Sequence, residues 1–246
     1  MNVVMLGATK GMGRALARRM AQRGDRLHLL GRDLADLERC ARDLEARSSS
    51  GLSVTCSPCD LERPETFLGA LTRADEALGG FDTVVVTAGL FATQDRLETD
   101  RELTRRVLVV DFAHTVLFCE DARARLLKRG GGTLCVFSSV AGERGRKPVV
   151  LYGAAKAGLT RYLEGLDHKF RAAGLRTVCV KPGFVKTSMT EGLPAPPFAA
   201  EADDVAGVVL KAIDQGTPVV YAPAVWGLVM FAIRHLPRFV MRRIGF

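Results

Sequence analysis

Short apolar runs alternate with longer amphipathic stretches over most of this 246-residue chain. The apolar runs predict strands at residues 2–7, 25–31, 52–57, 81–87, 132–138, 175–181 and 217–222. The intervening stretches show helical periodicity at residues 12–23, 34–47, 64–78, 101–128, 152–173 and 203–215. Strands separated by helices pair in parallel through right-handed crossovers, and runs this apolar are buried on both sheet faces. The pattern predicts a doubly wound, Rossmann-like α/β fold of about seven strands with helices on both faces.

Composition and charge indicate one globular domain with a distinct C-terminal tail. The 48% hydrophobic and 25% charged residues are typical of a folded protein. We expect one domain over residues 1–222, followed by an amphipathic tail over residues 223–246. The net charge is +8, and the four arginines of the tail have no acidic neighbour within it. Such a local basic patch argues against a general nucleic-acid binder.

Signals for metal binding and for targeting are weak. Of the six cysteines, Cys56 and Cys59 form a C-x-x-C pair, but a zinc site needs about four ligands and no second pair is present. We therefore expect no metal and interpret the cysteines as thiols of a reducing compartment. The chain enters a predicted strand without a signal peptide, and no run reaches the roughly 20 apolar residues of a membrane span. We expect a cytoplasmic protein that the tail can bring to the inner face of the membrane.

A glycine-rich turn, GATKGMG at residues 7–13, follows the first predicted strand and leads into a predicted helix. Glycines let the backbone approach a pyrophosphate closely, and the helix start offers free N–H groups and a positive dipole end. A turn without a ligand would not need three glycines at this spacing. The turn therefore predicts a dinucleotide site. Its expected members are Gly7, Thr9, Lys10, Gly11, Met12 and Gly13.

The end of the second predicted strand indicates which dinucleotide binds. A carboxylate there holds the ribose of NAD, whereas cations favour the 2′-phosphate of NADP. Gly31 and Arg32 stand at this point, and Lys10 adds a second cation from the glycine-rich turn. These residues favour NADP(H). NAD(H) is the alternative because Asp33 lies near the spacing of a ribose-binding acid, although we interpret Asp33 as a helix N-cap.

Tyr152 and Lys156 lie four residues apart at a predicted helix start and therefore share one helix face. A tyrosine hydroxyl has a pKa near ~10 in water, and a neighbouring ammonium lowers that pKa. Ser139, at the end of the fifth predicted strand, can hydrogen-bond a carbonyl or alcohol oxygen. A Tyr-x-x-x-Lys pair alone is common on helix surfaces. In combination with the upstream serine and the glycine-rich turn, it indicates an active site.

Together these motifs resemble the short-chain dehydrogenase/reductase family over nearly the whole of residues 2–221. The resemblance implies that Tyr152 is the general acid/base, that Lys156 is its modulator and ribose anchor, and that Ser139 orients the substrate oxygen. It also implies cofactor contacts at Asp60, Ala88, Gly89, Tyr152, Lys156, Pro182, Gly183, Val185 and Thr187. By the same resemblance we expect a homodimer or homotetramer built on the long helices.

Two positions depart from the pattern of that family. Thr87 stands where the family has the Asn of an Asn-Ala-Gly motif, and we expect this structural change to be tolerated. Asp111 stands where the resemblance places a fourth catalytic member, an Asn that supports a proton-relaying water. An aspartate can hold that water but adds a charge near Lys156. We therefore expect an active enzyme with altered electrostatics around its tyrosine and lysine.

The loop GERGRK (142–147) bears on the substrate because it follows Ser139. Its cations Arg144, Arg146 and Lys147 form either a solvated turn or a site for an anionic group such as a phosphate. The tail allows two interpretations as well. Its apolar stretch 224–233 and its arginines either pack on the domain or a second subunit, or lie in a membrane interface with Trp226 at headgroup depth.

The segments SSVAGERGRK, LYGAAKAGL and YAPAVWGLVMFAIRHLPRFVMRR are similar to the reductases of decaprenylphosphoryl-2-keto-ribose, which act with a partner flavoenzyme. This resemblance implies NADPH-dependent reduction of a lipid-linked ketone, with a proton from Tyr152. One alternative is a general NADP-dependent ketoreductase of 3-oxoacyl, steroid-like or polyketide ketones. Another is a cofactor-binding scaffold without turnover, against which the intact tyrosine–lysine pair argues.

Overall fold

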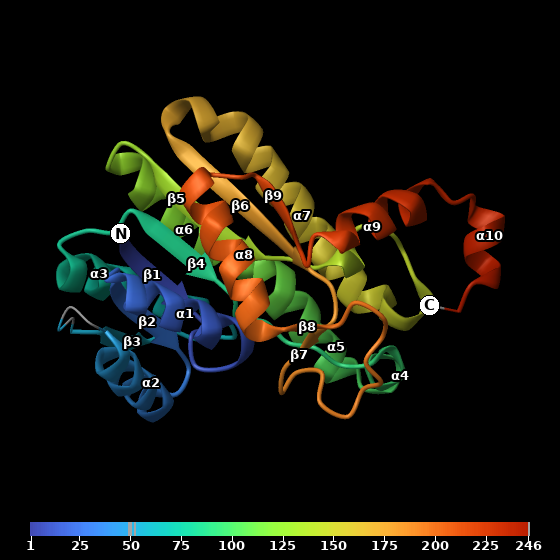
Figure 1. The fold of residues 1–246 in the computed structure, drawn as a ribbon, viewed down its shortest axis with the longest axis horizontal. Coiled ribbons are helices and arrows are strands. Elements are labelled where there is room, and N and C mark those ends of the chain that lie inside the picture. The colour runs from blue at the N-terminus through green and yellow to red at the C-terminus, as the bar shows by residue number, and fades with distance from the viewer. Residues whose placement is uncertain (49–50, 52, 246) are drawn as a thin grey trace.

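A parallel sheet runs through the centre of the computed structural model, which describes residues 1–48, 51 and 53–245 (Figure 1). Its strands are β1 (Asn2–Leu6), β2 (Arg26–Gly31), β3 (Thr55–Pro58), β4 (Thr83–Val86), β5 (Gly132–Phe137), β6 (Leu175–Pro182) and β9 (Val219–Ala222). They lie in the order β3-β2-β1-β4-β5-β6-β9. From β1 the sheet extends through β2 to β3 on one side, and β4 and the later strands are added on the other side of β1. A crevice is therefore expected between β1 and β4, where the strand order reverses. The predicted doubly wound, Rossmann-like sheet is confirmed.

Helices cover both faces of this sheet, as predicted. One face carries α1 (Gly11–Arg23), α2 (Leu34–Arg47) and α8 (Ala202–Gln215). The other carries α3 (Phe67–Leu78), α6 (Thr115–Lys128) and α7 (Val150–Phe170). Successive side chains of a strand point to opposite faces. Val3 and Met5 of β1 accordingly belong to the first core, whereas Val4 and Leu6 belong to the second.

Shorter elements surround the carboxyl ends of the strands. They include α4 (Gln94–Thr99), α5 (Arg101–Leu108) and a small sheet of β7 (Val185–Lys186) and β8 (Ala200–Glu201). None of the helices in the described residues has the length and apolar character that crossing a bilayer requires. The third strand begins at Thr55, later than expected, and residue 52 of the predicted strand lies outside the described residues.

The helix predicted over residues 101–128 is wrong as a continuous α-helix. A π-helical segment, Val109–His114, separates α5 from α6. Such a segment widens the turn by one residue and is frequent at functional sites. Inside it the carbonyl of Val110 accepts a hydrogen bond from the Thr115 hydroxyl at 2.7 Å. The altered turn directs Asp111 into the protein interior, where its side chain is fully buried.

The C-terminal tail extends to one side of the sheet as two short helices, drawn in red in Figure 1. These are α9 (Val225–His235) and α10 (Arg238–Arg243), and Pro237 between them is the N-cap of α10. The inner side of α9 buries Met230 and Ile233 against Val140. The tail therefore packs on the loop that follows β5, while residue 246 lies outside the described residues.

Candidate active site

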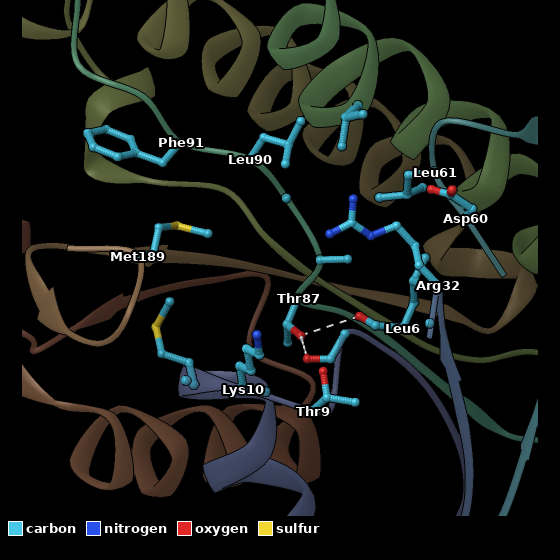
Figure 2. Close-up of a pocket in the computed structure, with 18 of the residues that line it drawn as sticks. Leu6, Thr9, Lys10, Arg32, Asp60, Leu61, Thr87, Leu90, Phe91 and Met189 are labelled. Carbon is cyan, nitrogen blue, oxygen red and sulfur yellow. Dashed lines mark hydrogen bonds between the residues drawn. The ribbon is translucent and has the colours of Figure 1, made fainter. Parts of the chain in front are cut away.

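A cavity of about 470 Å³ lies at the carboxyl ends of β1, β2, β3 and β4 (Figure 2). Of the residues predicted to contact the cofactor, those that line it are Gly7, Thr9, Lys10, Gly11, Met12, Gly13, Arg32, Asp60, Ala88, Gly89 and Thr187. Further lining residues that the sequence reasoning missed are Leu6, Cys59, Leu61, Glu62, Leu90, Phe91, Val110, Ser188 and Met189. Val110 precedes Asp111 in the π-helical segment, and each of the others lies within two residues of a predicted contact, so a wider window around those contacts would have found them.

The glycine-rich turn is tight enough to exclude side chains. Gly7 has a φ of +103°, and a Cβ atom there would lie 2.6 Å from the backbone nitrogen of Ala88. A Cβ on Gly13 would lie 2.2 Å from the Gly7 carbonyl oxygen. The Thr87 hydroxyl donates to that oxygen at 2.8 Å and to the Leu6 carbonyl at 3.3 Å, as the dashed lines of Figure 2 show. Thr87 thus ties the end of β4 to the turn.

Two cations reach the cavity where the cofactor choice is expected to be made. Lys10 from the glycine-rich turn and Arg32 from the end of β2 are exposed, and both extend toward the cavity in Figure 2. Asp33, the competing acid, accepts a hydrogen bond from the backbone nitrogen of Asp36 at 3.0 Å. The interpretation of Asp33 as the N-cap of α2 is therefore confirmed.

The reacting groups predicted from the sequence gather beside one end of this cavity. Tyr152 packs edge to face on the cavity residue Phe91, with ring centroids 5.2 Å apart. The Lys156 ammonium lies 5.7 Å from the centroid of the Tyr152 ring and donates to the Phe137 carbonyl at 3.2 Å. Ser139 follows β5, and its hydroxyl oxygen accepts a hydrogen bond from the backbone nitrogen of Ala141 at 3.1 Å.

Asp111 enters this group from the π-helical segment. Its Oδ1 accepts a hydrogen bond from the Leu90 backbone nitrogen at 2.7 Å. Its Oδ2 lies 3.9 Å from the Lys156 Nζ and has no hydrogen-bond partner within the described part of the chain. A Cβ atom on Gly89 would lie 2.9 Å from the Asp111 Oδ1, so glycine is needed where the cavity meets these groups.

The protonation of these groups follows from burial and from their mutual charges. Burial raises the pKa of Tyr152; Lys156 and the Ser139 hydroxyl act to lower it, and Asp111 acts to raise it further. Burial acts to lower the pKa of Lys156, but Asp111 and Tyr152 raise it above its usual value. Burial also raises the pKa of Asp111, against the effects of Lys156 and the Leu90 N–H. A phenol that stays protonated beside an ammonium is suited to donate a proton.

The basic loop at residues 142–147 is predicted to bind substrate through three cations, but two of these cations contact the tail instead. An Arg144 Nη2 donates to the Leu236 carbonyl at 3.0 Å, and the Lys147 Nζ donates to the Arg242 carbonyl at 2.8 Å. The Nε of Arg146 is buried without a hydrogen-bond partner among the described residues, and burial lowers the pKa of this guanidinium. The structure therefore does not bring all three cations to one anion site.

The Pro182–Gly183 turn after β6 lies outside the lining of the cavity and is covered by the tail. A Cβ atom on Gly183 would lie 2.0 Å from the Trp226 Nε1, so only glycine leaves room for the indole. Val185 is buried in β7, and its carbonyl accepts a hydrogen bond from the Thr190 hydroxyl at 2.7 Å. Sequence reasoning assigned no such contact to Trp226, because nothing in the chain near position 183 points to residue 226.

Comparison with known proteins shows what this chain is similar to. The family model described as short chain dehydrogenase matches residues 1–196. An uncharacterized oxidoreductase of Mycobacterium tuberculosis is 33% identical over 98% of this chain and 96% of its own length. A 3-oxoacyl-[acyl-carrier-protein] reductase of Bos taurus is 29% identical over 77% of each protein. A solved short-chain type dehydrogenase/reductase from Mycobacterium ulcerans has the same fold, with a TM-score of 0.80 at 20% identity over 89% of this chain and 86% of that one.

Proposed function

Because this chain belongs to the short-chain dehydrogenase family and is an oxidoreductase, we propose that it reduces a ketone with NADP(H) as cofactor and Tyr152 as proton donor. The observation that carries the proposal is the contact between a glycine-lined cavity and the Tyr152–Lys156 pair. Phe91 of the cavity packs against Tyr152, and Gly89 of the cavity lies against Asp111. The cofactor and the reacting groups would thereby meet at one end of the cavity.

The residues of the cavity fit a dinucleotide. A backbone turn that has no room for a Cβ at Gly7 or Gly13 lets phosphates approach N–H groups at the start of α1. Lys10 and Arg32 would hold the 2′-phosphate, which supports NADP(H) over NAD(H). When bound, the nicotinamide supplies the hydride that reduces the carbonyl carbon.

The residues of the chain handle the proton. Tyr152 would donate its phenolic proton to the carbonyl oxygen, while the Ser139 hydroxyl hydrogen-bonds that oxygen. The Lys156 ammonium would stabilise the phenolate that remains. The raised pKa of Tyr152 keeps the phenol protonated, which is the form that ketone reduction requires.

The substrate that the site supports best is a hydrophobic ketone with an anionic group, of which a polyprenyl-phosphate keto-sugar is the specific candidate. Phe91 and Met189 give the cavity an apolar end, and Arg146 is the loop cation without a partner among the described residues. Such a substrate would come from a partner flavoenzyme that forms the ketone by oxidation. The general ketoreductase alternative is supported by the bovine relative, whose name gives a 3-oxoacyl substrate.

The tail supports contact with an anionic membrane. Leu228, Phe231 and Phe239 point outward with exposed fractions of 77%, 59% and 62%. Arg238, Arg242 and Arg243 of α10 accompany them, and the tail contains no acidic residue. Apolar side chains can enter the lipid boundary while arginines meet anionic headgroups. A symmetric pairing of two tails would instead bring like charges together.

Flotation with anionic liposomes tests this contact. The intact chain should float, and a Leu228→Ser/Phe231→Ser variant should remain with the unbound protein. The membrane proposal is contradicted if the intact chain stays unbound, or if the tail variant changes the oligomeric state of the protein instead of its lipid binding.

The homodimer or homotetramer proposed for the catalytic domain does not depend on the tail. It is supported by exposed Phe112 and Leu117 along the π-segment and α6, and light scattering measures it.

The proposed reduction is tested by following NADPH consumption with a panel of ketones. The panel should contain a polyprenyl-phosphate keto-sugar, a 3-oxoacyl thioester and a steroid-like ketone. Turnover of the lipid-linked ketone in preference to the others supports the specific substrate. Preference for the thioester supports the general ketoreductase. Tight NADPH binding without consumption by any ketone would support the scaffold alternative and contradict the proposal.

A further inference from the structure

A buried carboxylate fastens the C-terminal tail to the loop that carries Ser139. We propose that Glu143 is a positioning residue that holds the tail in place, so that Trp226 forms a wall at the substrate end of the active site. The inference rests on the proposed function for the identity of that site. It goes beyond that function by assigning a role to the tail in substrate binding.

Glu143 is paired on both sides of its carboxylate. One oxygen lies 2.5 Å from the Lys181 Nζ, and the other lies 2.9 Å from an Arg234 Nη1. The side chains of Glu143 and Lys181 are 4% and 7% exposed, whereas Arg234 is 39% exposed. A buried charge needs partners for its remaining hydrogen-bonding positions, and here two cations supply them. Glu143 thus connects three segments: the loop that carries Ser139, the end of β6, and α9.

Glu143 is also connected to Ser139 through a single 3₁₀ turn, Val140–Gly142. The Glu143 backbone nitrogen donates to the Val140 carbonyl at 3.2 Å, and the Gly142 nitrogen donates to the Ser139 carbonyl at 3.1 Å. The Ser139 hydroxyl caps the same turn. A displacement of Glu143 would therefore move the hydroxyl proposed to orient the substrate oxygen.

The tail reaches the other side of the site through Trp226. Lys181, which pairs with Glu143, directly precedes the Pro182–Gly183 turn, and the indole of Trp226 lies against Gly183. The Trp226 Nε1 is buried without an acceptor in the part of the chain that the structure describes. A buried unpaired donor is unfavourable, and a substrate oxygen that reached this N–H as an acceptor would remove that cost.

Other contacts between the tail and the loop connect fewer elements of the fold. Val140 packs against Met230 and Ile233, and Arg144 donates to the Leu236 carbonyl. The apolar cluster also includes Tyr221 of β9, but neither contact involves a residue of β6. Glu143 also pairs with Lys181 of β6. Its pairing with Arg234 therefore fixes the position of the tail relative to both the loop that carries Ser139 and the end of β6.

The test uses Arg234→Met in the 246-residue chain, because this change removes the tail partner and leaves the buried Glu143–Lys181 pair intact. Trp226 is the single tryptophan of the chain, so its fluorescence reports the position of the tail directly. The matched control is Arg238→Met, since Arg238 is a tail arginine without an ion pair to any described residue. Arg234→Lys serves as the conservative variant that keeps the charge.

We expect Arg234→Met to shift the Trp226 emission to longer wavelength and to raise the KM for the ketone about tenfold. The dissociation constant for NADPH should change little, and Arg234→Lys should restore much of the loss. In assays without membranes, Arg238→Met should behave as the wild type, because its proposed contact is with lipid headgroups alone. An Arg234→Met protein with unchanged emission and unchanged KM overturns the proposal, as does an equal effect of Arg238→Met.

The outcome separates this inference from the proposed function. If the wild type reduces no ketone, the proposed function fails, and the emission of Trp226 still decides whether Arg234 holds the tail. A fluorescence shift in Arg234→Met then supports the positioning of the tail by Glu143, and an unshifted emission overturns it. Circular dichroism of each variant shows that the helices remain folded.

Discussion

The Asp111 carboxylate lies 3.9 Å from the Lys156 ammonium, and both side chains are buried beside Tyr152. The phenol is therefore subject to opposite influences, since the ammonium favours its ionisation and the carboxylate opposes it. This arrangement sets the chain apart from the family pattern, in which an uncharged Asn occupies the same position.

Replacing Asp111 by Asn should keep or raise the rate of ketone reduction. It should also lower the apparent pKa of alcohol oxidation, because loss of the carboxylate removes an influence that raises the pKa of Tyr152. The pH dependence of kcat/KM in both directions measures this. Asp204→Asn, the same change on the exposed part of α8, should leave the profile unchanged. A profile that shifts toward higher pH in Asp111→Asn would contradict the assignment.

Replacing Tyr152 by Phe should lower kcat for ketone reduction by about a hundredfold to ten-thousandfold, the usual contribution of a general acid. NADPH binding should persist because the cavity lining is unchanged. Tyr162→Phe is the matched control on α7, since the Tyr162 hydroxyl donates to Glu120 rather than facing the site. A Tyr152→Phe enzyme with wild-type turnover would exclude the proposed mechanism.

Replacing Arg32 by Ala should weaken NADPH binding about tenfold, as expected for the loss of a charge-assisted hydrogen bond to phosphate. Lys10→Ala should have a similar effect, whereas NADH binding should change little in either variant. Titration of both cofactors against the protein gives the two dissociation constants. Arg39→Ala, an exposed change on α2, should affect neither. Equal losses for NADH and NADPH would remove the basis for the NADP(H) preference.

His28 should make the folded state sensitive to acid. It is buried between the Thr55 and Ser57 hydroxyls, each 2.8 Å from a ring nitrogen, and burial together with the charge of Arg73 lowers its pKa from 6.5 to about 4. The unfolded chain therefore binds a proton first. The free energy of unfolding should fall by about 3 kcal/mol between pH 6.5 and about 4, with no further loss from this group below that pH.

Urea unfolding followed by circular dichroism at a series of pH values measures this loss. His28→Gln should flatten the dependence over the same interval, because no ring remains to be protonated. His168→Gln, a change at an exposed position of α7, should retain the wild-type dependence. A His28→Gln protein that still loses the full amount would assign the acid sensitivity to another group.

Much of the architecture could be predicted from the sequence because it depends on local periodicity. The apolar runs located all seven strands of the central sheet to within a few residues, and the turn at residues 7–13, which the sequence assigns to a dinucleotide site, lines the cavity. The four-residue spacing of Tyr152 and Lys156 places both on α7. In contrast, α4 escaped prediction because a helix of 6 residues is too short to show a helical period. The π-helical segment escaped because a single added residue per turn leaves no distinct hydrophobic pattern.

The sequence by itself therefore determined the order of elements and the chemistry available at the ends of the strands, because spacing along the backbone dictates which neighbouring residues share a face. Only the tertiary structure decided which distant groups meet. The packing of the π-helical segment on α7 brings Asp111 to Lys156, and the docking of α9 brings Arg234 to Glu143 and Trp226 to Gly183. These contacts depend on how faces pack across the fold, so spacing along the chain does not indicate them, and the approach of Asp111 to Lys156 was expected only from the family resemblance.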